Sequence, residues 1–102
     1  MIVCVARIEQ NRCRLDMTGH AGFNPGQDIV CAGASAIVTG LSAWIQNAGK
    51  YVKSTTVVQL EPGEAHFDVC GGEAVRQAFL QAVMGLGCIE MTYPENISVT
   101  IE

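Results

Sequence analysis

Two side chains that can act together in nucleophilic catalysis, His20 and Cys31, lie close in the sequence, with ten residues between them. A cysteine becomes a strong nucleophile when its thiol loses a proton, and imidazole is the side chain best suited to take a proton near neutral pH. Such a pair can cleave an acyl bond, because the imidazole can later hand that proton to a leaving amine. The intervening residues include Gly22, Pro25 and Gly26, so we predict an irregular loop that folds the imidazole back over the thiol.

The thiol is expected at the start of a helix. Asp28 is a good N-cap, and residues 29 to about 47 are apolar almost all round. Cys31 is then the third helical residue, where unpaired backbone N–H groups and the positive end of the helix dipole stabilise a thiolate. The same N–H groups can hold the oxyanion of a tetrahedral intermediate. Asp28 is also close enough in sequence to orient the His20 imidazole instead of capping the helix, and both roles stay open at this point.

Each of these residues also has an ordinary structural interpretation. A cysteine in an apolar helix is usually a core residue, and a histidine beside a glycine is often only a loop residue. A redox-sensing thiol at Cys31 would need the same chemical activation as a nucleophile. His66, between two acidic residues, is interpreted as a solvated residue on the outer row of a strand. His20, Asp28, Cys31 and His66 lack the compact spacing of a zinc site, so we expect neither a metal nor a cofactor.

Alternating apolar residues predict strands, and longer helical periodicities predict helices. The strands are expected at residues 2–9, 13–19, 55–60, 64–70 and 97–101, and the helices at 29–47 and 73–91. Residues 50–54 are expected to be a polar link, and residues 61–63 a Pro-Gly turn. The order strand-strand-helix-strand-strand-helix-strand, with one-sided alternation, predicts an α+β fold. We expect a mostly antiparallel or mixed sheet with both helices packed on one face.

Composition limits the classes of function. The 102 residues are expected to form one domain, residues 1–102, and with 49% hydrophobic residues a chain this short leaves apolar surface exposed. A homodimer is a natural way to cover that surface. The net charge is −4 and the six Lys and Arg residues are scattered, so we expect no direct binding of nucleic acid.

The cysteines and the N-terminus bear on location. Five cysteines without a C-x-x-C pair fit neither a disulfide framework nor a zinc ribbon, so we expect free thiols. Cys4, Cys13 and Cys88 are expected to pack in the core. The N-terminus lacks the features of a signal peptide, and we find no apolar run of about 20 residues to span a bilayer. The expected location is the cytoplasm, away from membranes.

A segment beginning with Gly-His-Ala, followed by a short glycine-containing loop and then Gln-Asp-Ile-Val-Cys-Ala at residues 27–32, resembles the signature of the ribosomal-processing cysteine proteases, the Prp family. The likeness extends over nearly the whole chain in length and element order. It implies that His20 and Cys31 form the catalytic dyad and that Asp28 and Ser35 match supporting positions. It also implies that a loop moves over the active site, formed by Gly22, Phe23, Asn24, Pro25 and Gly26.

The resemblance further implies a substrate. Proteases of this family remove a short N-terminal extension from large-subunit ribosomal protein twenty-seven, cut after an aromatic pair, and form homodimers. The expected protein is therefore a cysteine endopeptidase of ribosome maturation, with a ribosomal-protein N-terminal peptide as substrate. The alternative is a non-catalytic ribosome-assembly or binding module in which Cys31 is a structural or redox-sensing thiol. Phe23 is expected either to contact an aromatic substrate side chain or to plug into the protein's own core.

Overall fold

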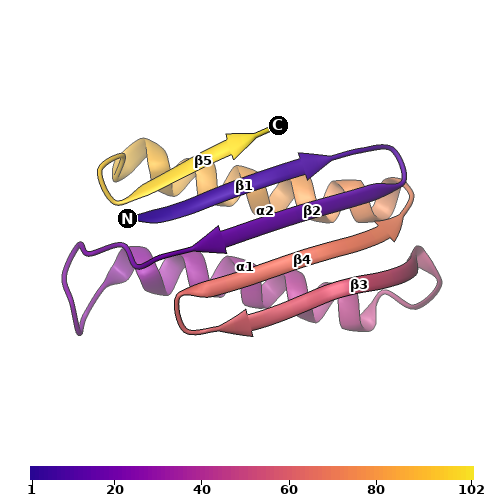
Figure 1. Cartoon of the computed structure of the whole chain (residues 1–102), viewed down its shortest axis with the longest axis horizontal. Coiled ribbons are helices and arrows are strands. Elements are labelled where there is room, and N and C mark those ends of the chain that lie inside the picture. The colour runs from indigo at the N-terminus through magenta and orange to yellow at the C-terminus, as the bar shows by residue number, and fades with distance from the viewer.

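The computed structural model describes residues 1–102, and the helices and strands follow the predicted order (Figure 1). The elements are β1 Ile2–Ile8, β2 Arg12–Thr18, α1 Ile29–Asn47, β3 Val52–Glu61, β4 Glu64–Gly71, α2 Glu73–Thr92 and β5 Ile97–Ile101. A 3-10 turn at Gly49–Tyr51 precedes β3. The α+β class is confirmed.

The strands form one mixed sheet in the order β3-β4-β2-β1-β5. Only β5 runs parallel to its neighbour, β1, and the other pairs are antiparallel. Thr18 at the end of β2 pairs with Glu64 at the start of β4. The residues that follow β2, His20 among them, therefore come out beside the turn that joins β3 to β4.

Both helices cover one face of the sheet and leave the other face open (Figure 1). The alternation predicted for the first two strands turns Cys4, Cys13 and Leu15 toward the helices, where all three are fully buried. Phe67 of β4 and Phe79 of α2 meet edge to face in this core, with ring centroids 6.3 Å apart. Burial, helped by the nearby charge of Glu90, raises the pKa of the Cys4 thiol to about 12. Cys4 is therefore a protonated core residue, as expected.

Two details differ from the sequence analysis. The expected polar link at residues 50–54 contains the start of β3, because Val52 already pairs with Gly71. The register shifts just afterwards, and such irregularities break the alternation that identifies a strand. Cys88, expected in the core, is exposed. It follows the buried Leu86 by two residues, which turns it about 200° around the helix from the buried stripe.

Helix α1 is long and apolar enough to cross a membrane by length and composition, with a mean hydropathy of 1.5. The sequence analysis expected no apolar run long enough to span a bilayer, and by length and composition that expectation is wrong. In the folded chain, 33% of the apolar window is buried. Its buried stripe includes Val30, Ala34 and Val38, which recur at helical spacing and belong to the core.

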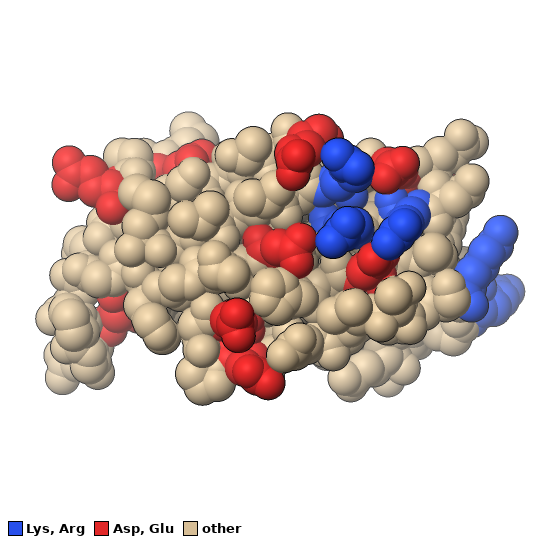
Figure 2. Space-filling model, viewed as in Figure 1, with Lys and Arg blue, Asp and Glu red and all other residues tan.

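The open face of the sheet gathers charges that are scattered in the sequence (Figure 2). Arg7 and Arg14 are direct partners across β1 and β2, and Arg12 precedes Arg14 by two residues on the same strand face. Carboxylates lie among these arginines: Arg12 Nε donates to Asp68 Oδ1 at 2.8 Å, and Arg14 Nε lies 3.8 Å from Asp68 Oδ2. The Arg12 hydrogen bond holds the pKa of Asp68 below its usual value.

Candidate active site

A sharp bend after β2 delivers His20 to the site. Gly19 has φ +97°, and a Cβ atom built there would lie 2.2 Å from the carbonyl oxygen of Met1. Only glycine fits this bend without moving the N-terminus. The N–H of Gly19 donates to the carbonyl oxygen of Gly63 at 2.9 Å, which fastens the bend to the β3–β4 turn.

The imidazole of His20 rests against that same turn. A Cβ atom built on Gly63, which has φ +76°, would lie 2.8 Å from His20 Nε2. Any side chain at position 63 would therefore push against the imidazole. The tip of the β3–β4 hairpin is one wall of the space that the His20 ring occupies.

Asp28 caps the helix that carries Cys31. Its Oδ1 accepts hydrogen bonds from the N–H groups of Val30 at 2.9 Å and Cys31 at 3.0 Å. Its Oδ2 accepts from the N–H groups of Phe23 at 2.9 Å and Asn24 at 3.3 Å. Burial alone would raise the pKa of Asp28, but these backbone N–H hydrogen bonds lower it below its usual value. The carboxylate thus joins the loop to the helix, and none of its hydrogen bonds reaches His20.

This capping corrects one mechanistic expectation. The N–H groups of the helix start were expected to be free to hold an oxyanion, but two of them, those of Val30 and Cys31, donate to Asp28 Oδ1. A helix start that is capped by a carboxylate has fewer free donors to offer a substrate. The first turn of α1 therefore positions the thiol, and these two N–H groups do not form an oxyanion hole in this structure.

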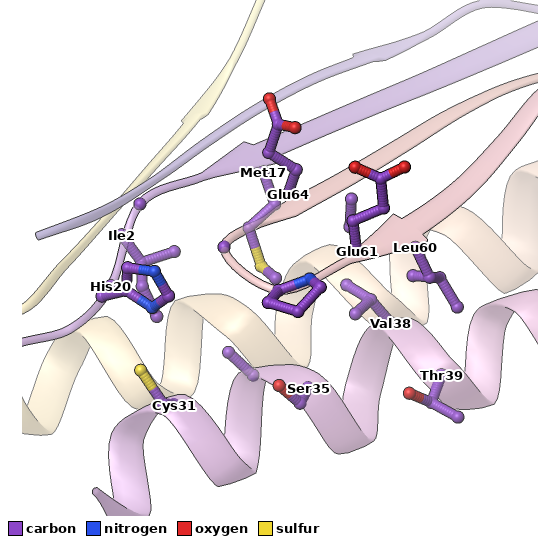
Figure 3. A pocket seen from close by; sticks show the side chains of 15 residues that line it. Ile2, Met17, His20, Cys31, Ser35, Val38, Thr39, Leu60, Glu61 and Glu64 are labelled. Carbon is purple, nitrogen blue, oxygen red and sulfur yellow. The ribbon is translucent and has the colours of Figure 1, made fainter. Parts of the chain in front are cut away.

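The thiol of Cys31 is half-buried and points toward the imidazole of His20 (Figure 3). Its Sγ accepts a hydrogen bond from the N–H of Ala21, with a nitrogen to sulfur distance of 3.2 Å. No hydrogen bond joins the thiol to the imidazole directly, which is common in sites without substrate. The Ala21 N–H is thus the one hydrogen-bond donor that reaches the sulfur.

A pocket of about 390 Å³ opens between α1 and the β3–β4 turn, with Cys31 and His20 among its lining residues (Figure 3). Ser35, one helical turn after Cys31, lines the same pocket from α1. Glu61 and Glu64 line it from the hairpin, with their carboxylates directed away from Cys31 and His20 (Figure 3). The sequence analysis treated the hairpin only as a turn, so these two glutamates were missed as pocket residues.

The predicted loop lies beside the pocket. None of its residues, Gly22, Phe23, Asn24, Pro25 and Gly26, lines the pocket, and all are exposed. Phe23 is 46% exposed and packs edge to face on Tyr93, with ring centroids 4.9 Å apart. The interpretation of Phe23 as a core plug is therefore wrong. Its contact with a substrate stays a prediction.

His66 is separate from this site. It lies on the open face of the sheet, where its Nδ1 is 2.7 Å from Asp16 Oδ1. The hydrogen bond with Asp16 raises the pKa of His66 above its usual value. Of the two histidines, His20 lies beside Cys31 at the pocket, and His66 does not. No group of three or more His, Cys, Asp or Glu side chains is arranged as a metal site.

Two further contributors carry little signal in the sequence. Ala21 acts through its backbone N–H, and its methyl side chain indicates nothing about the sulfur nearby. Gly63 was recognised as part of a turn, but its approach to His20 depends on the pairing of β2 with β4. That the Pro-Gly turn lies beside His20 can be inferred only once the strand order is known.

A small α+β protein with a cysteine at a helix start, facing a histidine across a pocket, has the arrangement of a thiol hydrolase. Comparison with known families agrees. The chain belongs to the family of the cysteine protease Prp, whose family model matches residues 1–98. This is a family of ribosomal processing cysteine proteases, so the resemblance seen in the sequence is confirmed.

Solved structures show the same fold. Two crystal structures of an essential ribosomal processing protease Prp from S. aureus are 25% identical to this chain over 100% of both chains. The one with a covalently linked product peptide has a TM-score of 0.79, and the one with a substrate peptide 0.74. A Streptococcus mutans structure, 22% identical, covers 99% of this chain and 93% of its own, with a TM-score of 0.72. Comparison with curated proteins found no match.

Proposed function

We propose that this protein is a cysteine endopeptidase that removes the N-terminal extension of large-subunit ribosomal protein twenty-seven by cutting after an aromatic pair. The observation that carries the proposal is the Cys31 thiol, fixed at the capped start of α1 and pointing toward His20 on one pocket (Figure 3). Family membership supports the protease chemistry, and the S. aureus relatives hold product and substrate peptides.

The proposed reaction uses two residues. His20 takes the proton from Cys31 Sγ, and the thiolate attacks the carbonyl carbon of the scissile bond to form a carbon–sulfur bond. The carbon–nitrogen bond then breaks as His20 gives the proton to the departing amine. Water hydrolyses the resulting thioester, which releases the carboxylate product and restores the thiol. The Ala21 N–H, 3.2 Å from Sγ, supports the thiolate before attack.

The pocket suits an aromatic side chain. Met17, Val38 and Leu60 supply apolar surface to a volume of about 390 Å³. Aromatic side chains bring a large apolar area to such a site. We propose that one ring of the aromatic pair enters this pocket, so that the bond after the pair lies over Cys31.

Peptide cleavage tests the proposal. A peptide with an aromatic pair near a ribosomal-protein N-terminus is incubated with the protein, and the products are identified by mass spectrometry. The matched control carries two alanines in place of the pair. We expect one cut, directly after the pair, and a kcat/KM at least about 100-fold lower for the control, because the apolar contact of the ring in the pocket is lost. Equal cleavage of both peptides would refute the aromatic specificity.

The alternative is a non-catalytic binding module with Cys31 as a packing or redox-sensing thiol. Alkylation separates the two, provided that the other accessible cysteines, the half-buried Cys70 and the exposed Cys88, are removed as Cys70→Ser and Cys88→Ser. Fast, pH-dependent labelling of Cys31 supports the peptidase. Cys4 and Cys13 are buried and should stay unlabelled in the folded protein. Labelling of Cys31 as slow as that of an ordinary exposed thiol would favour the binding module.

We also propose that the enzyme acts as a homodimer in the cytoplasm. An apolar groove of about 1060 Å³ runs between α1 and α2, lined in part by Ile37, Leu41, Trp44, Leu80 and Met84. Apolar surface of this kind is typical of protein interfaces. The cysteines are all unpaired, which suits a reducing compartment. The proposal treats residues 1–102 as one catalytic domain.

A further inference from the structure

We propose that Asn96 is a positioning residue for the Cys31 and His20 pair, acting through the backbone of Ala21. The inference rests on the proposed function, which it deepens. Asn96 lies between α2 and β5, 75 residues from Ala21 in the sequence, and its Nδ2 donates to the carbonyl oxygen of Ala21 at 3.0 Å. It is the only group in the protein that donates to that carbonyl.

The hydrogen bond matters because Ala21 is held from both sides. Its carbonyl accepts from Asn96, and its N–H donates to Cys31 Sγ at 3.2 Å. Ala21 is 3% exposed, so water has little access to replace either partner. The direction of the N–H toward the sulfur is therefore set by the residue that holds the carbonyl.

Asn96 is itself firmly placed. Its N–H donates to the carbonyl oxygen of Tyr93 at 3.0 Å, and its own carbonyl accepts from the N–H of Ile2 at 2.9 Å. The second bond ties Asn96 to the first residue of β1, inside the sheet. The side-chain amide thus fixes the backbone of Ala21 relative to the sheet, as the supporting groups of a preorganised site do.

His20 stands between two residues that are held in this way. Gly19 is bonded to Gly63 at 2.9 Å, and Ala21 is bonded to Asn96 at 3.0 Å. Beyond Ala21 the exposed loop of residues 22–27 begins. Without Asn96, Ala21 would be held only through its N–H to Cys31 Sγ. Both the imidazole and the donor to the thiol would then have more freedom, and catalytic geometry is sensitive to shifts of about 1 Å.

The test compares two variants at this position with a matched control. Asn96→Asp keeps the shape of the side chain but replaces the donor with an oxygen that repels the Ala21 carbonyl, and Asn96→Ala removes the donor without adding charge. The control is Asn47→Asp, because Asn47 Nδ2 also donates to a backbone carbonyl, that of Ala43 at 2.7 Å, on the exposed end of α1. Thermal unfolding shows that each variant is folded.

The first readout is peptide cleavage. In both Asn96 variants we expect kcat to fall by about 10- to 100-fold with KM changed by less than about 2-fold, since the substrate still binds but the reacting groups are misplaced. The control should match the wild type. A rise in KM with unchanged kcat would instead assign Asn96 to substrate binding and overturn the proposal.

The second readout needs no substrate, so it decides on Asn96 even if the peptides are never cleaved and the proposed function fails. The alkylation rate of Cys31 is measured against pH in the Cys70→Ser, Cys88→Ser background. His20, Glu61 and Glu64, which line the pocket with the thiol, and the capping Asp28 are the same in every variant. Asn96→Asp adds a carboxylate near the thiol, so the uncharged Asn96→Ala decides this readout. We expect the midpoint of the profile to move to higher pH and the rate at pH 7 to fall about 3- to 10-fold. An Asn96→Ala profile that superimposes on the wild type would overturn the proposal.

Discussion

Backbone atoms of neighbouring residues hold His20 and Cys31 in place more than side chains do. Gly63 supplies a surface against which the imidazole rests, and Ala21 supplies the N–H that meets the sulfur. Asp28 is the exception, since its carboxylate accepts from the N–H of Cys31 at 3.0 Å. The positions of His20 and Cys31 therefore depend on residues that carry no chemistry of their own.

The two histidines give a direct comparison at this scale. We expect His20→Ala to lower kcat/KM by about 10² to 10⁴, because general acid–base help of this size is lost with the imidazole. His66→Ala should leave cleavage within about 2-fold, since His66 bonds to Asp16 on the open face of the sheet. The measurement is the rate of peptide cleavage for each variant. A larger loss for the His66 change would show that the dyad is assigned wrongly.

Asp28 predicts a pH-dependent stability. Its pKa in the folded protein lies below its unfolded value, so its hydrogen bonds stabilise the fold above about pH 3.9. That stabilisation is lost as the pH falls through the folded pKa. We expect the wild type to melt several degrees above Asp28→Asn at pH 7, and the difference to vanish toward pH 2. A control is Glu95→Gln, which changes an exposed carboxylate without hydrogen bonds. A difference that is constant with pH would contradict this account.

Sequence analysis could propose candidate site residues at this scale because side-chain types carry the signal. His20, Cys31 and the cap residue Asp28 were visible from their types and spacing. Ala21, Gly63 and Asn96 were not, because their contributions depend on which backbone atoms the sheet places next to the site. Asn96 is 75 residues from the alanine it holds, and no local pattern links the two.

At the scale of elements, the loop between β2 and α1 links both halves of the site. Ala21 at its start donates to Cys31, and Phe23 and Asn24 within it donate to Asp28 at its end. Its middle is exposed and lines no part of the pocket. This arrangement suits a segment that changes position when a peptide binds, which we keep as a prediction.

A glycine substitution tests this prediction. Gly26 has φ +91° with open space around it, so Gly26→Val strains the loop backbone without touching the core. We expect cleavage to fall by about 10-fold or more with little change in thermal stability. The control is Gly49→Val, because Gly49 also has a positive φ, +57°, with open space around it but precedes β3. Equal activity in the two variants would contradict a role for loop conformation in catalysis.

Hydrogen exchange measures the loop motion itself. Amides of residues 21–27 should exchange more slowly when an uncleaved peptide is bound to the Cys31→Ala variant. The N–H groups of Phe23 and Asn24 already have an acceptor in Asp28, so the clearest change is expected at Gly22 and Gly26. The same protection with and without peptide would rule out a lid.

The elements themselves were largely predictable, since one-sided alternation and helical spacing are strong signals. The start of β3 was missed because the register shifts at Val52 and Thr55 disturb its alternation. The expected oxyanion donors were also misjudged. A cap signal in the sequence shows that a carboxylate can reach the helix start, but the structure shows how many donors it occupies.

At the scale of the whole molecule, the two helices cover one face of the sheet (Figure 1). The apolar groove between them is lined by residues of α1 and α2. Met84 lines this groove and is 69% exposed. Met91 on the same helix is 84% exposed but does not line it. Substitutions at Met84 and at Met91 therefore compare an exposed residue in the groove with an exposed residue outside it.

We expect Met84→Glu to convert the proposed homodimer into a monomer, because a buried, unpaired carboxylate is costly in an interface. Met91→Glu should leave the dimer intact. Light scattering coupled to size-exclusion chromatography gives both masses against the chain mass of 10.9 kDa. A wild type that is already monomeric, or a Met84→Glu dimer, would contradict the use of this groove.

The fold class followed from the pattern of elements, but the strand order did not. The parallel pairing of β5 with β1 brings the segment before β5 next to the loop after β2. Such neighbours arise from the closing of the whole sheet, and alternation within one strand does not reveal them. The same holds for the groove, which depends on how α1 and α2 lie against each other.

The central claim is that the thiol of Cys31 is the nucleophile, and single-turnover cleavage with Cys31→Ala tests it most directly. Alanine fits the small-residue start of α1, so the variant should fold, which circular dichroism and thermal unfolding confirm independently. We predict that the wild type cuts the aromatic-pair peptide and that the folded Cys31→Ala protein binds it without cutting. Cleavage by Cys31→Ala at a rate close to the wild type would contradict the account.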